Sequence, residues 1–383
     1  MRILHVFPFY SIKKGGGTTW LIDQLAKAQT KNGHKVEVLV GDFKFDTDNL
    51  NKNNSYSVRK FKSYFNFFGI YLMPSLIFFA YNNLNKYDII HIHLFRSIQN
   101  IIICLFAIKF KVPYIIDAHG SLPRHIWYKK FKKTVYDITF GNLILKNAKI
   151  CIAENELSYK EYIDFGISDD KISIIRPPFP IEDYASLPKK GIFKSENNLL
   201  KLHLITFMGR IHWIKGIDLL LHAYIKLLKK RKDIMLIIVG EDDGYKQNLK
   251  KIIDKEDLND RVLFTGYLSG DKKLSCLVDS SVVVQTSRYE QGAGVPLEAV
   301  LCNTPIIVSD NSGAGLDVKR LNAGFIVKFG DIDELSSTID YVINNQEESV
   351  AKTVLGANRV KQSLSIKNNI LEYDLIYKLC NKE

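Results

Sequence analysis

The sequence lacks the patterns that mark several large protein classes. Its longest apolar runs, 70–81 and 101–108, fall short of the roughly 20 residues that cross a bilayer. Its five cysteines are scattered and never in CxxC spacing, which predicts free thiols in a reducing compartment and no disulfide framework. The opening MRILHVFPF carries one basic side chain and is typical of a buried strand, not of a signal peptide. We therefore expect a cytoplasmic protein.

Signatures of several catalytic classes are also missing. There is no GxGxxG with a following acid, which argues against an NAD-dependent dehydrogenase, and no GxSxG elbow of a serine hydrolase. No histidine or cysteine cluster has the spacing of a metal site. The acidic segment 45–50 lies in a polar loop with no apolar strand leading into it. We expect neither a metal nor another cofactor.

Size and charge bound the remaining classes. With 383 residues, 46% of them hydrophobic and 25% charged, the chain is predicted to form two soluble domains. Residues 1–190 hold 27 Lys and Arg against 16 Asp and Glu, whereas residues 191–383 hold 26 against 25. This one-sided basic charge favours an anionic partner such as a membrane, or is a lysine-rich background with no partner. No motif supports nucleic-acid binding, which we do not expect.

Apolar strand patterns alternate with helical patterns twice along the chain. Such an alternation predicts parallel sheets covered by helices on both faces, so the fold class is α/β with two doubly wound domains. The proline-rich segment 176–198 is typical of a linker. We expect one domain at 1–178, which a helix at about 366–383 joins, and a second at 185–365. Ligands of such sheets bind beyond the carboxyl ends of the strands.

A cationic loop follows the first strand of the second domain. Arg210 comes directly after the strand at 202–209, and Lys215 leads into an amphipathic helix. A helix N-terminus offers unpaired N–H groups and partial positive charge, so this arrangement predicts a diphosphate site. The alternative is a pair of surface cations.

An acidic loop follows the strand at 280–287. Glu290 lies in the loop and Glu298 lies early in the helix that the following proline opens. Carboxylates beside exposed N–H groups suit a polyhydroxylated ligand, because sugar hydroxyls donate to carboxylates and accept from backbone. The helix dipole alone would explain Glu298 but not Glu290. The N–H groups are those of Gly292, Ala293 and Gly294.

Three other loops are weaker candidates. The glycines of 13–20 form a predicted loop before a helix that begins at about residue 18, and they would let a phosphate or sugar approach. His119 ends the strand at 113–120 and is either a site residue that points into the proposed cleft or a structural histidine. The turn at 264–274 could bind a nucleotide base through main-chain groups. These loops and the cationic loop add Gly16, Gly17, Gly209, Tyr267 and Leu268 as candidate donor contacts.

Two stretches of the first domain, 59–74 and 124–137, mix basic and aromatic residues. This composition is typical of helices that lie in a membrane interface, or of core-facing helices with a basic flank. The candidate membrane or acceptor contacts are Arg124, Trp127, Lys129, Lys130, Phe131, Lys132 and Lys133.

These segments together resemble a known family. The run GRIHWIKGIDLLLHAY and the two glutamates eight positions apart in EQGAGVPLEAVLCNTPIIVSDNSG resemble the donor half of retaining glycosyltransferase family 4, the glycosyl transferases group 1. GGGTTWLIDQLAKAQTKNGHKVEVLV, YDIIHIHL and DAHG resemble its acceptor half. The resemblance implies a GT-B fold, with two Rossmann-like domains that face each other across a cleft and a C-terminal helix that returns to the first.

The resemblance also implies roles. Arg210 and Lys215 would hold the diphosphate without a metal, Glu290 would contact the donor sugar and Glu298 the ribose. Gly16 and Gly17 would approach the phosphates, and His119 the sugar. The chain departs from the family where EQGAG replaces a common Glu-Gly-Phe-Gly and where Asn303 replaces a glycine. The implied catalytic set is Arg210, Lys215, Glu290 and His119.

We therefore expect a retaining transferase that moves a hexose-type sugar from a UDP- or GDP-sugar to a glycan or lipid-linked acceptor. It would be cytoplasmic and could bind the inner face of the cell membrane. One alternative is a nucleotide-sugar epimerase on the same fold, which would need no acceptor. Another is a non-catalytic protein that binds a membrane or polyanion, which would leave the two glutamates without a role.

Overall fold

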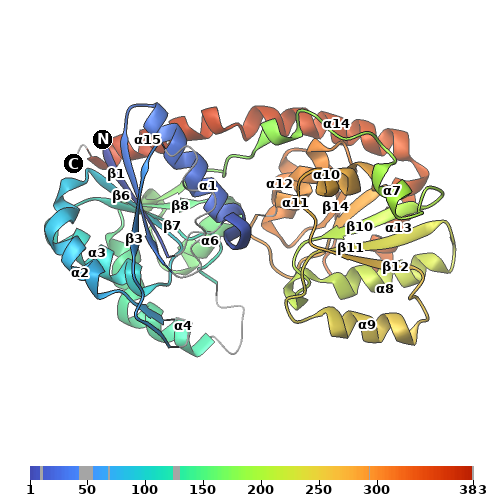
Figure 1. Cartoon of the computed structure of the whole chain (residues 1–383), viewed down its shortest axis with the longest axis horizontal. Coiled ribbons are helices and arrows are strands. Elements are labelled where there is room, and N and C mark those ends of the chain that lie inside the picture. The colour runs from blue at the N-terminus through green and yellow to red at the C-terminus, as the bar shows by residue number, and fades with distance from the viewer. Residues whose placement is uncertain (9–11, 43–54, 68–69, 124–129, 293, 382–383) are drawn as a thin grey trace. The chain divides into compact units, whose positions relative to one another are not determined.

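The computed structural model describes residues 1–8, 12–42, 55–67, 70–123, 130–292 and 294–381. The chain forms two compact units (Figure 1): unit 1 comprises Met1–Phe179 and Ile366–Glu383, and unit 2 comprises Pro180–Ser365. Each unit is a parallel sheet between helices, so the α/β class predicted from the alternating pattern is confirmed. Each of the five cysteines is a buried thiol and not half of a disulfide.

The sheet of unit 1 has its strands in the order β3-β2-β1-β6-β7-β8-β9, all parallel. Successive strands are added outward from β1 on one side and outward from β6 on the other. The strand order therefore reverses between β1 and β6, although all the strands are parallel. In open parallel sheets, ligands bind beyond the carboxyl ends of the strands at such a reversal of strand order. The strands are β1 (Arg2–Phe7), β2 (Lys35–Gly41), β3 (Ser57–Phe61), β6 (Ile89–His93), β7 (Tyr114–Asp117), β8 (Ile150–Ala153) and β9 (Ile172–Ile174).

Helices cover both faces of this sheet. On one face, α1 (Ile12–Lys31) and α15 (Ile366–Asn381) lie side by side and bury Ile22, Tyr373 and Tyr377 against the strands (Figure 1). The other face packs against α2 (Pro74–Asn83), α3 (Ile98–Phe110), α5 (Asn142–Asn147) and α6 (Glu156–Asp164). A shorter helix, α4 (Lys130–Tyr136), continues through a π-helical turn at Asp137–Gly141 into α5.

Two local predictions for unit 1 are wrong. The basic-aromatic stretch 59–74 forms the end of β3 and a hairpin of β4 (Phe65–Phe67) and β5 (Ile70–Leu72), because aromatic residues suit the pleated surface of strands. The glycines of 13–20 belong to α1 instead of a loop, since that helix already begins at Ile12. Each glycine costs a helix about 1 kcal/mol relative to alanine, and the apolar residues further along α1 anchor it on the sheet.

Unit 2 has a six-stranded parallel sheet in the order β12-β11-β10-β13-β14-β15. The strand order reverses between β10 and β13, which are parallel neighbours. Helices α8, α9 and α13 cover one face, while α10, α11 and α12 cover the other (Figure 1). The elements are β10 (His203–Met208), α8 (Ile217–Leu228), β11 (Ile234–Val239), α9 (Lys246–Lys255), β12 (Val262–Gly266), α10 (Gly270–Asp279), β13 (Val282–Gln285), α11 (Gly294–Leu301), β14 (Ile306–Ser309), α12 (Gly313–Arg320), β15 (Phe325–Val327), α13 (Ile332–Asn344) and α14 (Gln346–Ser363).

Among the described residues, none of the helices combines the length and the apolar character needed to cross a membrane.

Candidate functional site: two loops at the reversal of the second sheet

The loops after β10 and β13 leave the unit 2 sheet side by side, at the point where its strand order reverses. Gln285, the last residue of β13, donates a side-chain hydrogen bond of 2.6 Å to the carbonyl of Met208, the last residue of β10. The N–H of Gly209 donates to the Val239 carbonyl at 2.9 Å. These bonds fix where both loops begin.

The two loops also touch further out. The hydroxyl of Thr286 donates to the carbonyl of Gly216 at 2.9 Å. Gly216 has a left-handed φ of +64°, and a Cβ at that position would lie 1.9 Å from the Thr286 carbonyl oxygen. Only glycine allows this approach, and it brings the start of α8 against the end of β13.

Lys215 and Glu290 meet between these loops. Their side chains form an ion pair between Nζ and Oε2, and both are about one-sixth exposed, at 16% and 17%. The Ser287 hydroxyl lies 3.4 Å from the same carboxylate oxygen, and the Gly313 N–H donates to the Glu290 carbonyl at 2.7 Å. A cation and a carboxylate that were each singled out in the sequence thus occupy one place in the fold.

Arg210 and Glu298 lie in the same unit with partners of their own. The Arg210 side chain is 67% exposed and pairs with Asp243, in the loop after β11. Glu298, in α11, accepts a hydrogen bond of 3.0 Å from Nζ of Lys273 in α10. Burial and then the neighbouring Glu298 raise the pKa of Tyr184 well above its usual range. Neither Asp243, Lys273 nor Tyr184 was predicted, because these contacts join segments far apart in the sequence.

Arg288 connects the two loops and was also not predicted. Its guanidinium donates to both carboxylate oxygens of Asp218, at 2.8 and 2.6 Å, and to the Trp213 carbonyl at 2.7 Å. Its backbone N–H donates to the Ile214 carbonyl at 2.8 Å. Asp218 lies in the first turn of α8, where the helix dipole favours an acid. The only signal in the sequence is a basic residue two positions before Glu290.

The remaining donor candidates have these positions. Tyr267 is exposed and Leu268 half-buried directly after β12, Gly292 is exposed, and Gly294 begins α11. Gly16 and Gly17 lie within α1 of unit 1. Ala293 lies outside the described residues.

Of the basic-aromatic set, Arg124, Trp127 and Lys129 also lie outside the described residues, and Lys130 begins α4. Phe131 is 78% exposed and Lys132 is exposed, whereas the Lys133 ammonium donates to the Pro123 carbonyl at 2.6 Å.

A chain of histidines in unit 1

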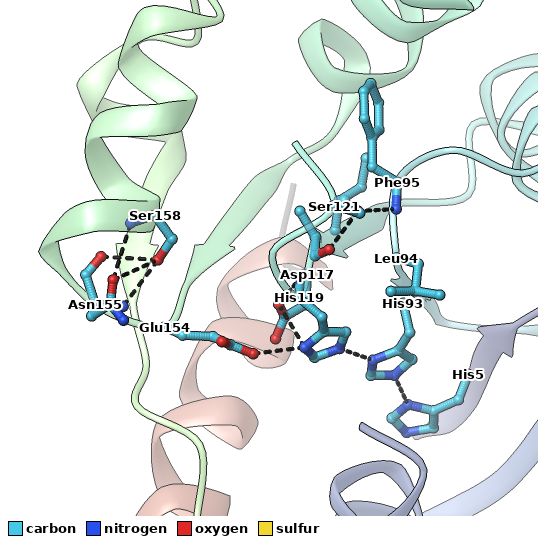
Figure 2. A network of polar contacts seen from close by, with 12 residues as sticks. His5, His93, Leu94, Phe95, Asp117, His119, Ser121, Glu154, Asn155 and Ser158 are labelled. Atoms are coloured by element: carbon cyan, nitrogen blue, oxygen red, sulfur yellow. Dashed lines mark hydrogen bonds and ion pairs between the residues drawn. The ribbon is translucent and has the colours of Figure 1, made fainter. Parts of the chain in front are cut away.

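His119 lies just past β7, and its side chain packs inside unit 1. The ring is only 3% exposed. Its Nε2 lies 2.9 Å from Nδ1 of His93, while its Nδ1 lies 2.7 Å from a carboxylate oxygen of Glu154 and 3.1 Å from one of Asp117 (Figure 2). The interior of unit 1 thus supplies partners for both ring nitrogens, as expected of a structural histidine, and a contact between His119 and a donor sugar stays a prediction.

The row of hydrogen-bonded histidines continues inward through residues that the sequence analysis did not predict. His93 Nε2 lies 2.9 Å from His5 Nδ1 (Figure 2), and His5 Nε2 lies 2.7 Å from Oε1 of Gln29 in α1. His91 lies beside them, with its Nδ1 2.7 Å from the Tyr377 hydroxyl of α15. The signal for these residues was the alternation of isoleucine and histidine in IIHIH, which places both histidines on the same face of β6.

Burial decides most of the charges in this cluster. It lowers the pKa of His5 to about 4 and those of His91 and His93 well below their usual value, so these three rings are neutral. Burial also opposes charge on His119, but Asp117 and Glu154 outweigh it and raise the pKa of His119. For Asp117, burial raises the pKa to about 7, although His119 acts in the opposite direction.

Comparison with known proteins

Two protein-family models match adjoining parts of the chain. The model described as Glycosyltransferase Family 4 matches residues 15–183, and the model described as Glycosyl transferases group 1 matches residues 189–354.

Curated relatives match most of the chain. An uncharacterized glycosyltransferase of Methanocaldococcus jannaschii is 26% identical, covering 98% of this chain and 97% of the relative. The 2-deoxystreptamine N-acetyl-D-glucosaminyltransferase of Niallia circulans is 25% identical over 70% of each chain.

Solved structures agree on the fold. HepE of Anabaena in complex with UDP aligns with a TM-score of 0.79 at 19% identity, covering 99% of this chain and 100% of HepE. The lipopolysaccharide glycosyltransferase WaaG aligns with a TM-score of 0.70 at 14% identity, covering 96% of this chain and 99% of WaaG.

The two doubly wound units have the GT-B fold, and the family models over both halves show that the chain is a glycosyltransferase of this class. Within that class the chain belongs to glycosyltransferase family 4, with a glycosyl transferases group 1 domain in unit 2.

Proposed function

We propose that the protein transfers a hexose-type sugar from a UDP- or GDP-sugar to a glycan or lipid-linked acceptor, with retention at the anomeric carbon. The observation that carries this proposal is the meeting of Lys215 and Glu290 at the strand reversal of unit 2. A nucleotide-sugar carries a diphosphate and a set of hydroxyls, and this place offers a cation for the first and a carboxylate for the second.

Arg210 and Lys215 would bind the diphosphate. Lys215 would turn from Glu290 to the phosphates, and the exposed Arg210 would exchange Asp243 for the same ligand. The freed Glu290 would then accept hydrogen bonds from sugar hydroxyls, and Glu298 from the ribose. Two cations neutralise the charge that develops on the leaving diphosphate, so we propose that no metal is required.

The donor type rests on chemistry and on a structural neighbour. HepE of Anabaena has a structure in complex with UDP-glucose, and it aligns with this chain with a TM-score of 0.80 at 20% identity, covering 99% of each chain. That likeness supports a nucleotide-sugar donor for this protein. The choice of uracil and glucose in that complex is a property of HepE, so the test includes both UDP-sugars and GDP-sugars.

The test combines binding with turnover. Thermal shift and calorimetry with UDP, GDP, ADP and their sugars should identify one preferred nucleotide. Arg210→Ala with Lys215→Ala should abolish both its binding and the transfer. Lys226→Ala with Lys250→Ala, which removes two exposed cations elsewhere in unit 2, should leave both unchanged. Transfer at near wild-type rate in the first variant would refute the diphosphate assignment.

Three further measurements address metal dependence, the reaction class and the stereochemistry. Full activity after EDTA treatment would agree with a metal-independent reaction, and loss that Mg²⁺ or Mn²⁺ restores would contradict it. Product analysis distinguishes transfer from epimerisation, because an epimerase releases a changed nucleotide-sugar without any acceptor. The anomeric configuration of the product, read by NMR, tests retention.

Exposed apolar side chains on unit 1 favour a second property, contact with an anionic membrane. On α4 and the following turn, Phe131, Val135 and Ile138 are 78%, 44% and 70% exposed at helical spacing, with the exposed Lys132 among them. Such a surface inserts aromatic residues into the headgroup region while lysines attract acidic lipids.

Cosedimentation with vesicles of phosphatidylcholine and phosphatidylglycerol tests this contact. Wild-type binding should rise with the acidic lipid and fall with salt. Phe131→Ser with Ile138→Ser should reduce it severalfold. Leu371→Ser with Leu375→Ser, at two exposed positions on α15, is the matched control and should not. Binding that is indifferent to lipid charge would contradict the proposal.

A further inference from the structure

The histidine chain of unit 1 has geometry that constrains its protons. The ring planes of His93 and His119 differ by 3°, their centroids are 5.2 Å apart, and the bonded nitrogens are 2.9 Å apart. His5 and His93 repeat this arrangement with 5.2 Å between centroids, 19° between planes and 2.9 Å between nitrogens. The rings therefore meet edge to edge, which is the geometry of an N–H···N hydrogen bond.

The ends of the chain are both hydrogen-bond acceptors. At the inner end, His5 faces the carbonyl oxygen of Gln29, and at the outer end, His119 faces the carboxylate of Glu154. Four links, Gln29–His5, His5–His93, His93–His119 and His119–Glu154, each need one N–H proton. A neutral imidazole carries one N–H, so three neutral rings supply one proton too few.

The missing proton has one favourable location. His5 and His93 are fully buried, and among the described residues their hydrogen-bond partners are Gln29 and other histidines, whereas His119 contacts the carboxylates of both Asp117 and Glu154. The other titratable groups near this end are His91 on β6 and Tyr373 of α15, which faces Asp117. A proton added to the chain is therefore stabilised most on the ring between the two acids.

We propose that Gln29, His5 and His93 act as positioning residues that hold one excess proton on His119, so that its ring is a doubly protonated cation above neutral pH. Gln29 accepts a hydrogen bond from His5, so the other nitrogen of the His5 ring has to accept from His93. For the same reason His93 has to accept from His119, and Gln29 thereby sets the donor in each link of the histidine chain. The His119 ring then holds a positive charge, paired with Glu154 and Asp117, at the carboxyl end of β7, the end of a parallel sheet at which ligands bind.

The test reads the proton directly. In protein labelled with ¹⁵N-histidine at pH 8, two-bond ¹⁵N–¹H spectra distinguish singly from doubly protonated rings, and His119→Asn assigns the signal. Wild type should show His119 with both nitrogens protonated. Gln29→Met removes the inner acceptor and should lower the midpoint of His119 titration by about one pH unit or more. Gln29→Glu keeps an acceptor and should retain the cation.

His5→Phe provides a second route if Gln29→Met does not fold. It leaves two rings and two links, so no excess proton is required, and the midpoint should fall as well. A singly protonated His119 in wild type, or a midpoint that Gln29→Met and His5→Phe leave unchanged, would overturn the proposal. So would stoichiometric zinc in the purified protein, because His5, His91 and His93 are close enough to share a metal ion that would displace the proton.

A further experiment on catalysis rests on the proposed function. If the charge on His119 assists transfer, Gln29→Met should move the alkaline limb of the pH–rate profile to lower pH by the same interval as the NMR midpoint, while Gln29→Glu should not. An unmoved limb with a shifted midpoint would overturn the catalytic part. Absence of nucleotide-sugar turnover in wild type would refute the proposed function and leave the NMR result standing.

Discussion

Lys215 and Glu290 are 75 residues apart in the sequence, and they form an ion pair between the loops that follow β10 and β13. Each satisfies the charge of the other in a place where both are largely shielded from water. A ligand that separates them has to replace both interactions, which a diphosphate joined to a sugar can do. The pair therefore gives sharp expectations for single substitutions.

Lys215→Met should weaken nucleotide binding about tenfold or more, which is about 1.4 kcal/mol, because a point charge on the diphosphate is lost. Glu290→Gln should leave the nucleotide Kd within about threefold and lower kcat for the nucleotide-sugar about 100-fold, since a carboxylate toward the sugar is lost. Calorimetry and steady-state kinetics check both. If Glu290→Gln weakens UDP or GDP binding as much as Lys215→Met does, the acid only orients the lysine.

Arg288→Lys should destabilise the protein by about 1 kcal/mol and raise KM for the donor. Lysine cannot reproduce the two hydrogen bonds to Asp218, so the loops after β10 and β13 lose their cross-link. Arg231→Lys is the control, because Arg231 makes the same kind of paired contact with Asp233 at a distance from this site in the sequence. An equal rise in KM for both variants would show that general destabilisation, not loop position, is responsible.

Gly216→Ala should lower the free energy of unfolding by about 3 kcal/mol or more, or prevent folding, because its Cβ would collide with the Thr286 carbonyl. Gly244→Ala is the matched control. Gly244 also has a left-handed φ, at +88°, but nothing lies within 4 Å of its Cβ position, so only a strain of about 1–2 kcal/mol is expected. Chemical denaturation of the two variants measures the difference, and equal losses would contradict the close approach.

Stability should fall on acidification below about pH 6.5. Burial lowers the pKa of His5 to about 4 and the pKa values of His91 and His93 well below their usual value, so below about pH 6.5 the unfolded chain binds three protons that the folded chain excludes. Asp117 acts in the opposite direction, because its raised pKa of about 7 lets the folded state bind a proton first. The net difference of about two protons corresponds to a slope of about 2.7 kcal/mol per pH unit.

Denaturation curves from pH 7 to pH 4.5 test this slope. His91→Asn removes one of the three titrating rings and offers a polar atom to Tyr377. The slope of stability against pH should therefore fall by the contribution of one proton, about 1.4 kcal/mol per pH unit. A stability that stays constant over this range in wild type would show that the buried rings titrate normally.

How far the sequence predicted the fold depended on local pattern. Apolar runs bounded by glycine or polar residues identified the buried parallel strands, such as β10 and β13, because both faces of those strands are covered. The edge strand β3 has no such run, since its residues before Phe61 are exposed except for the half-buried Val58. The glycines near the start of α1 were misinterpreted because their cost in a helix is offset by packing elsewhere in that helix.

The residues of the candidate site also divide into those that local sequence pattern predicted and those that it did not. The sequence indicated Lys215 and Glu290 because each lies in a loop that follows a strand, at the end of the sheet where ligands bind. Arg288 and Lys273 depend on contacts between loops and helices that no spacing reveals. The histidine chain depends on register: His5 pairs with His91, and His93 with Asp117, so strands from distant segments place these side chains on one face.

The placement of α15 determines the order in which the protein can mature during synthesis. Tyr373 and Tyr377 of this helix fill the core beneath β1 and β6, so unit 1 has an incomplete interior until residues near 380 are made. Unit 2 is continuous in sequence and can fold as soon as it leaves the ribosome. The half of the chain translated first is therefore the half that finishes last, and its exposed sheet face would be a natural substrate for chaperones.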